Sequence, residues 1–255
     1  MSKKFPLTYS KDDINFIFSM CTMSPYVNNN SEYKKKASKT RIVLSDASLV
    51  NAFASGSNSS YKIQLNAGLC DICAFIGLAL AKYRVDRNIY DLSTACKWAG
   101  DESIANEFKF TKQLVLDGIE KFNYTESDTL FHDAGSYFTG LVLSVCGHEL
   151  GHICCGHTLN QSVSNQTSRN DERTADLFAQ SIISATPFGS YLILSSLFVE
   201  IVFAWMSPNE EESPATTHPY SRERVYNILT SHEEYLNSLG INKSNIDDFL
   251  PRENK

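Results

Sequence analysis

The sequence contains too little glycine and proline for a fibrous or disordered protein, and it has no excess of basic residues. Of its 255 residues, 12 are glycine and 7 are proline, which are counts typical of folded globular chains. Lysine and arginine total 23 against 29 aspartate and glutamate, a net charge of −6. This charge gives no electrostatic reason to expect a nucleic acid as partner. We therefore expect a soluble globular protein that binds no nucleic acid.

A secretory signal is missing as well, because no apolar stretch follows the two lysines near the N-terminus. The odd number of cysteines, seven, argues against a disulfide framework. Cys70 and Cys73 form a CxxC pair without the second pair that a zinc ribbon requires, and we interpret them as buried thiols. These features predict a cytoplasmic protein.

One apolar segment, residues 188–206, is nearly long enough to cross a bilayer. It contains Glu200, it has no lysine or arginine close to either end, and the acidic sequence SPNEEESP follows it. The positive charge that marks the cytoplasmic end of a membrane span is therefore missing. We interpret the segment as a buried core helix in which Glu200 has a partner, and we expect no membrane association. A membrane span is the alternative.

The apolar pattern predicts a single, mainly helical α+β domain over residues 1–255, with a small sheet and with residues 1–40 as a variable N-terminal extension. The expected strands are residues 41–44 and 61–65, and the expected loops are residues 28–41, 55–60 and 160–170. The expected helices are residues 69–83, 92–108, 112–122, 136–157, 171–184, 188–206 and 221–239.

The sequence His148-Glu149-Leu150-Gly151-His152 is an HExxH motif within an apolar helical stretch. On a helix, residues four apart share a face, so both imidazole rings can bind one metal ion. Glu149 lies on the neighbouring stripe, where its carboxylate can accept a hydrogen bond from a metal-bound water without binding the metal. Two histidines and a glutamate on an apolar helix need polar partners, so a plain core helix is the less favoured interpretation.

A catalytic zinc ion needs a third protein ligand. The third histidine of a metzincin is replaced here by Thr158, which excludes that class. Glu172 and Asp176 lie four residues apart in the sequence ERTAD, on one helix face. Glu172 can be the third ligand, and Asp176 can accept the free N–H of a zinc-bound imidazole, expected to be that of His148. The two motifs together predict one zinc ion per chain, bound by His148, His152 and Glu172.

A third motif, THPYSRER at residues 217–224, opens another expected helix. His218, which precedes a proline, can donate a hydrogen bond to the oxyanion that develops during peptide hydrolysis. Arg224 can contact Asp176 or Glu172, or bind a substrate carbonyl. On this stretch alone, a helix-capping histidine and a surface arginine are an equal alternative.

The order HELGH, ERTAD and THPYSRER resembles the gluzincin peptidases related to the CAAX-prenyl-protease and Oma/BepA-type families. This resemblance implies a zincin-like metallopeptidase domain with the following roles: His148, His152 and Glu172 as zinc ligands, Glu149 as general base, Asp176 as the partner of a ligand, and His218 and Arg224 as residues of the late motif. Over residues 60–230 the chain is most similar to Lit-type phage-exclusion peptidases. Those are cytosolic bacterial enzymes associated with cleavage of translation elongation factor Tu during phage infection.

Two other interpretations stay open. The stretches HELGHICCGH and ERTADLFAQSII also resemble ImmA/IrrE-type peptidases, which cleave repressors. Those usually have asparagine at the position of Asp176 and lack the THP…R motif. The other interpretation is a catalytically silent, zinc-stabilised regulatory or binding protein. His157 lies five residues after His152 and would point around the helix from it, so we expect that His157 is not a ligand.

The sequence thus predicts a zinc endopeptidase that hydrolyses a protein substrate, with elongation factor Tu as the candidate and a phage-derived activator as a further partner. Zinc would lower the pKa of its bound water, and Glu149 would take the proton. Residues 61–65 are expected to be the edge of the sheet, along which an extended substrate pairs as an added strand.

Overall fold

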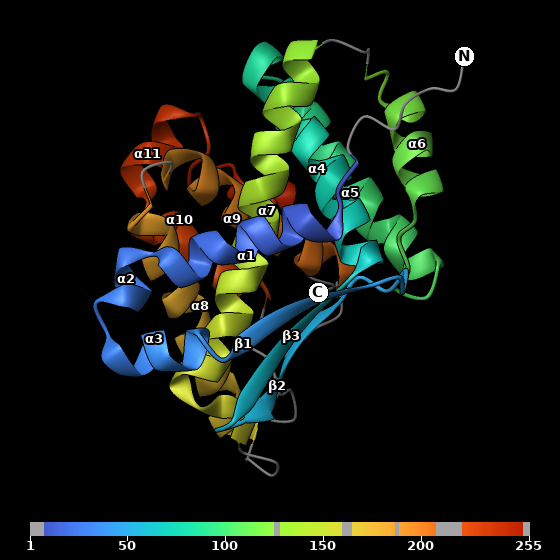
Figure 1. The fold of residues 1–255 in the computed structure, drawn as a ribbon. Coiled ribbons are helices and arrows are strands. Elements are labelled where there is room, and N and C mark those ends of the chain that lie inside the picture. The colour runs from blue at the N-terminus through green and yellow to red at the C-terminus, as the bar shows by residue number, and fades with distance from the viewer. Residues whose placement is uncertain (1–7, 125–127, 160–164, 187–188, 208–220, 252–255) are drawn as a thin grey trace.

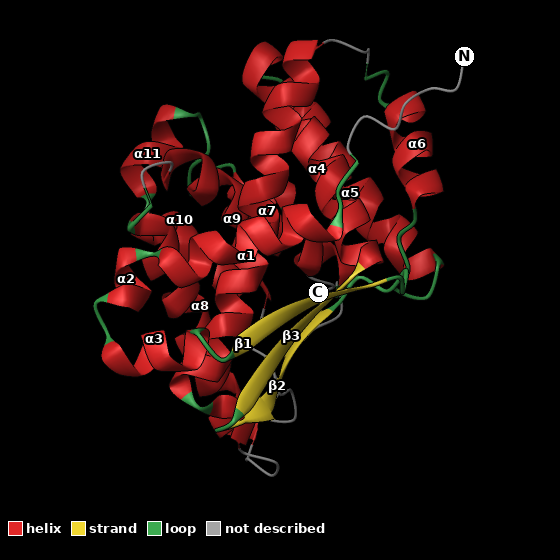
Figure 2. Ribbon diagram, in the orientation of Figure 1, coloured by secondary structure: helices red, strands yellow, loops and turns green. Residues whose placement is uncertain are grey.

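Helices form most of the protein, and a small twisted sheet lies at one side of them (Figures 1 and 2). The computed structural model of the chain describes residues 8–124, 128–159, 165–186, 189–207 and 221–251. The sheet packs on the helices rather than alternating with them along the chain. This arrangement confirms the predicted mainly helical α+β class.

The sheet has three strands, β1 (Thr40–Ser45), β2 (Ala52–Ser57) and β3 (Ser60–Asn66), in the order β1-β3-β2. β1 is parallel to β3, and β2 is antiparallel to it. The predictions of strands at 41–44 and 61–65 are confirmed. The prediction of a loop at 55–60 is wrong in its first half, because residues 52–57 form β2. Most of these side chains are small or polar and do not indicate a strand, which pairing with β3 stabilises.

The order of the strands also corrects the predicted substrate edge. Residues 61–65 belong to β3, which is paired on both sides and so cannot accept another strand. The two edges of the sheet are β1 and β2. Edge position depends on strand order, which local sequence periodicity does not encode.

Three helices precede the sheet: α1 (Lys11–Met23), α2 (Pro25–Asn28) and α3 (Ser31–Ala37). The predicted loop at 28–41 is wrong for residues 31–37. Asn30 begins α3 by accepting hydrogen bonds from the backbone N–H groups of Glu32 and Tyr33. The apolar face of α1 is buried against α7, so the N-terminal extension contributes to the core. That face consists of Ile14, Ile17, Phe18 and Cys21.

Helix α7 (Asp128–Cys155) runs through the centre of the molecule and touches helices from both ends of the chain (Figure 1). It packs on α4 (Ala67–Asp86), α8 (Asn165–Ser184), α9 (Gly189–Met206) and α1. The remaining helices are α5 (Ile89–Ala105), α6 (Lys112–Lys121), α10 (Ser221–Ser231) and α11 (Glu233–Ser238), with short 3-10 turns at His157–Leu159 (η1) and Ile246–Phe249.

Several helix boundaries differ from the predictions; α7, for example, begins at Asp128, eight residues before the predicted start. α7 ends at Cys155, two residues before the predicted end, because Gly156 adopts a φ of +87° that a helix does not allow. α8 begins at Asn165, so that the second half of the loop predicted at 160–170 is helical, while residues 160–164 lie outside the described residues. The predicted helix at 221–239 is divided at His232 into α10 and α11.

The apolar segment at 188–206 packs as a core helix. α9 contacts α5, α7 and α10, and Glu200 has the predicted buried partner, Arg224. Among the described residues, one helical segment is long and apolar enough to cross a membrane, Leu130–Cys155 of α7. In its most apolar 18-residue window, 78% of the residues are buried inside the protein. Core helices of soluble proteins meet the same criterion.

The contact between α4 and α7 yields a prediction about stability. A Cβ atom at Gly77 of α4 would lie 2.8 Å from the Ala134 carbonyl oxygen and 3.2 Å from the Phe138 nitrogen, which are backbone atoms of α7. We expect Gly77→Ala to lower the free energy of unfolding by about 1–3 kcal/mol in urea denaturation, because the helices must separate.

The matched control is Gly135→Ala on α7, where an added Cβ would meet nothing within 4 Å. This control should raise the free energy of unfolding by up to about 1 kcal/mol, since alanine favours a helix more than glycine does. Equal stabilities of the two variants would contradict the tight contact at Gly77.

Candidate metal centre

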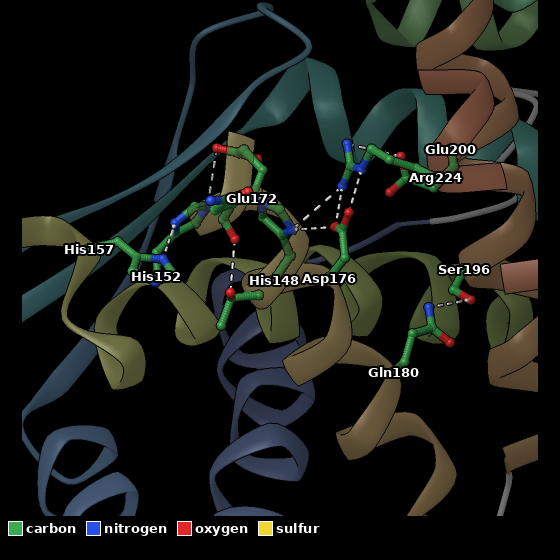
Figure 3. A network of polar contacts seen from close by, with 11 residues as sticks. His148, His152, His157, Glu172, Asp176, Gln180, Ser196, Glu200 and Arg224 are labelled. Carbon is green, nitrogen blue, oxygen red and sulfur yellow. Dashed lines mark hydrogen bonds and ion pairs between the residues drawn. The ribbon is translucent and has the colours of Figure 1, made fainter. Parts of the chain in front are cut away.

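The last two turns of α7 and the middle of α8 bring three metal-binding side chains together (Figure 3). His148 and His152 share one face of α7, and their Nε2 atoms are 3.0 Å apart. Glu172 reaches them from α8, with Oε2 at 3.3 Å from Nε2 of His148 and Oε1 at 3.4 Å from Nε2 of His152. The structure therefore juxtaposes the three ligands that the sequence predicts.

The distances between the donor atoms suit a metal ion. Zinc with bonds of about 2.0–2.1 Å in tetrahedral geometry has ligand atoms about 3.3–3.4 Å from one another. His148, His152 and Glu172 offer donor atoms that all lie within 4.8 Å of one another, and they form the one such group of histidine, cysteine and carboxylate side chains in the described part of the chain. Two imidazoles and a carboxylate are a donor set that zinc accepts, so the residues can hold this metal.

Two glycines allow the helices to approach closely enough. A Cβ atom at Gly147 would lie 3.3 Å from Cα of Ala179, and one at Gly151 would lie 3.0 Å from Cα of Ala175. These positions alternate with the two histidines along α7. Small residues on both helices therefore set the distance across which Glu172 reaches the histidines.

Asp176 holds the ring of His148 from the side opposite the metal position. Its Oδ1 is 2.8 Å from Nδ1 of His148, and Arg224 of α10 forms a bidentate pair with it, Nη2 to Oδ1 at 2.6 Å and Nε to Oδ2 at 2.9 Å. Burial works to raise the pKa of Asp176, but Arg224 and His148 lower it to about 2. The ionised carboxylate leaves the proton of His148 on Nδ1 and directs Nε2 toward the position where a metal ion can bind.

Arg224 also pairs with Glu200 of α9, whose Oε2 is 3.0 Å from Nη1. The guanidinium thus joins α8, α9 and α10, and of the alternatives for Arg224 the structure shows contact with Asp176. The sequence does not indicate Glu200 as a site residue, but its side chain lines the cavity at the metal position. The signal that could have included it was a single carboxylate inside an apolar helix, because such a group needs a buried cation.

Glu149 lies beside His148, His152 and Glu172 but is not part of the group that could hold a metal ion. It is 9% exposed and lines the same cavity as His148 and His152. Burial raises its pKa, while the two histidines and a backbone hydrogen bond from Ala54 of β2 lower it. The carboxylate therefore lies between the metal position and the sheet.

His157 lies in a position that the sequence does not predict. Because α7 ends at Cys155, His157 turns back in η1 and places its Nδ1 at 3.0 Å from Nδ1 of His152. Its Nε2 is 3.5 Å from Oδ1 of Asp171. The expectation that His157 points around the helix from His152 assumed that the helix continues to 157.

A cavity of about 520 Å³ opens at the metal position. β2 forms one of its walls and α9 another. The lining residues from these elements include Ala52, Phe53, Ala54, Glu200, Phe203 and Met206. The predicted site residue His218 lies outside the described residues.

Comparison with known proteins gives one match. The family model described as Peptidase U49 matches residues 94–239, which is more than half of the chain and includes α7, α8, α9 and α10. No curated protein matches the chain, and no solved structure matches it.

The contact between Glu200 and Arg224 predicts a pH-dependent stability. Burial raises the pKa of Glu200 to about 7, above its ordinary 4.5, although Arg224 lowers it. The folded protein therefore holds a proton that the unfolded chain releases between these values. The resulting stabilisation is fully present below pH 4.5 and is lost as the pH rises through about 7.

The test is urea unfolding of metal-free protein between pH 5 and 8, with Glu200→Gln compared to wild type. We expect the free-energy difference between variant and wild type to shift in favour of the variant as the pH rises, by a total on the order of 3 kcal/mol. His148 is present in both proteins, so the two chains compared differ only at position 200. A difference that stays constant over this range would contradict the raised pKa.

Proposed function

The chain belongs to the Peptidase U49 family, and from this premise we propose that it is a zinc-dependent endopeptidase that acts on a protein substrate in the cytoplasm. The observation that supports the proposal best is the convergence of His148, His152 and Glu172 beside the buried carboxylate of Glu149. In this proposal the first three residues bind the zinc ion and Glu149 is the general base.

A bound zinc ion would lower the pKa of a water molecule and polarise the carbonyl of the scissile peptide. The residues of the chain prepare the site for this chemistry. His148 and His152 present Nε2, Asp176 holds His148 in the required tautomer, and the cavity wall excludes bulk water from Glu149. The Glu149 carboxylate takes the proton of the water and passes it to the leaving amine.

The raised pKa of Glu149 supports its role as a base. A carboxylate of ordinary pKa is a weak acceptor near neutral pH, whereas one whose pKa is raised by burial accepts a proton more readily. The hydrogen bond from the Ala54 N–H orients the carboxylate but does not protonate it. This combination suits a group that must accept a proton and release it within one reaction.

We place the substrate along β2, the edge of the sheet that lines the cavity. The Asn51 carbonyl accepts a hydrogen bond from the N–H of Asn66 in β3. Because successive residues of a strand direct their backbone groups to opposite sides, those of Ala52 and Ala54 face away from β3. The N–H of Ala54 donates to Glu149, so the groups of Ala52 and the carbonyl of Ala54 are the ones offered to a substrate. An extended peptide can add to this edge as a further strand, which would bring its scissile bond to the zinc ligands.

Two roles in the proposal come from the sequence. His218 is proposed as the hydrogen-bond donor to the oxyanion, in keeping with the resemblance of THPYSRER to the late motif of gluzincins. Arg224 is proposed as a positioning residue, which acts on His148 through Asp176. A substrate carbonyl would have to compete with two carboxylates for this guanidinium.

The substrate and its regulation form the finer part of the proposal. In keeping with the resemblance to Lit-type peptidases, we propose that the enzyme cleaves translation elongation factor Tu and that a phage-derived activator starts the reaction. Constant cleavage of an abundant translation factor would kill the cell, so that activity requires a trigger.

The first test separates the peptidase from a silent zinc-binding protein. We expect Glu149→Gln to abolish cleavage of the substrate while keeping about one zinc ion per chain, because Glu149 moves the proton but does not bind the metal. The matched variant Glu172→Ala should lose both zinc and activity. The measurements are metal content by mass spectrometry and fragment formation on gels. Undiminished cleavage by Glu149→Gln would contradict the role of Glu149.

The second test concerns the substrate. Purified enzyme is incubated with elongation factor Tu, with and without lysate of phage-infected cells, beside Glu149→Gln as the inactive control. We expect a discrete pair of fragments only with wild type and infected lysate. An intact factor in every sample, together with cleavage of a DNA-binding repressor, would favour the ImmA/IrrE-type alternative and leave the zinc chemistry in place.

A further inference from the structure

We infer that His157 and Asp171 form a hydrogen-bonded pair that positions the ring of His152, and that they thereby strengthen metal binding. The inference rests on the proposed metal centre, in which His152 is a ligand. Neither residue contacts the metal position in this inference, so both are positioning residues.

The contacts run in one line from the metal position to Asp171 in α8. His152 directs Nε2 toward His148 and Glu172, and its other ring nitrogen, Nδ1, lies 3.0 Å from Nδ1 of His157. Nε2 of His157 lies 3.5 Å from Oδ1 of Asp171. Figure 3 shows His157 beside His152 on the side away from Asp176. The side chains of His157 and Asp171 are 11% and 22% exposed, so water competes little for these contacts.

The positions of the protons follow from the chemistry of imidazole. When Nε2 of His152 gives its lone pair to a metal, the proton of the neutral ring lies on Nδ1. This N–H can donate to His157 only if Nδ1 of His157 carries a lone pair, and the proton of His157 then lies on Nε2. That atom faces Oδ1 of Asp171, which lies 3.5 Å away and is the acceptor that we infer for this N–H. Every donor in the line has an acceptor.

The two histidine ligands are thus held in different ways. Asp176 contacts His148 directly and is itself fixed by Arg224 of α10. His152 instead contacts the neutral ring of His157, and the carboxylate of Asp171 contacts that ring from its other side. Asp171 and Glu172 are consecutive on α8, so a single helix holds the third ligand and the carboxylate that orients His152.

His157 is not placed to bind the same ion. Its nearest nitrogen faces Nδ1 of His152, whereas the donor atoms of the metal position surround Nε2. The group of possible metal ligands within the described residues contains His148, His152 and Glu172 but not His157. The geometry therefore supports orientation of a ligand and not ligation by His157.

The experiment measures zinc affinity directly, by competition with a chromophoric chelator, so that it does not depend on activity. We expect His157→Ala to bind zinc about 10- to 100-fold more weakly than wild type. Removal of a residue that hydrogen-bonds to a metal ligand has an effect of this size in other zinc proteins. His157→Gln should stay within a few-fold of wild type, because glutamine has both an acceptor for His152 and a donor for Asp171. His132→Ala, which changes a histidine whose side chain is 83% exposed, is the control and should bind as wild type does.

A double-mutant cycle tests whether Asp171 acts through His157. Asp171→Ala, which removes the acceptor, should weaken zinc binding in the wild-type background and have no further effect on His157→Ala, because the line of contacts is then already broken. Equal weakening in both backgrounds would overturn the pairing. The melting temperatures of the metal-free variants show whether each one folds. If His157→Ala does not fold, Asp171→Ala still tests the contact, because it removes the acceptor while His157 stays in place.

The outcomes separate this inference from the proposed function. Unchanged zinc affinity in His157→Ala would overturn the inference while leaving the zinc peptidase intact. Loss of zinc as complete as in His152→Ala would also overturn it, since His157 would then be a ligand. Absence of zinc binding in the wild-type protein would instead overturn the metal centre and the inference together.

Discussion

The close contact between α7 and α8 is the constraint on which the candidate site depends. Gly147 and Gly151 of α7 face Ala179 and Ala175 of α8, and these small residues let the two helix backbones approach each other. Only at this distance does Glu172 reach the histidines of α7. A larger side chain at either glycine would displace α8, and with it the third ligand and both carboxylates that lie next to the histidine rings.

The second feature that supports the site is the buried guanidinium of Arg224. It lies between Asp176 of α8 and Glu200 of α9, so three helices meet on one positive charge. Burying two carboxylates and a guanidinium is costly unless each is paired. The arrangement offsets this cost through bidentate geometry, and it holds His148 in the tautomer that metal binding needs.

Much of this site could be predicted from sequence, because its signals are local. HExxH and ExxAD each place two side chains four residues apart, and helical geometry then decides which of them share a face. The helices at 69–83, 112–122 and 188–206 could be predicted for the same reason. β2, α3 and the contact of His157 with His152 could not: β2 depends on pairing with β3, α3 on the cap at Asn30, and His157 on a turn at Gly156.

The sequence by itself determined the helical class of this protein, the spacing of its candidate metal-binding residues and the need of Glu200 for a partner, because periodicity and the cost of burying charge act on any chain with these residues. Only the tertiary structure decided that β3 is central and β2 is the edge, that Arg224 serves both Asp176 and Glu200, and that His157 turns back toward His152. Each of these depends on which distant segments pack together, and such contacts produce no periodic pattern in the sequence.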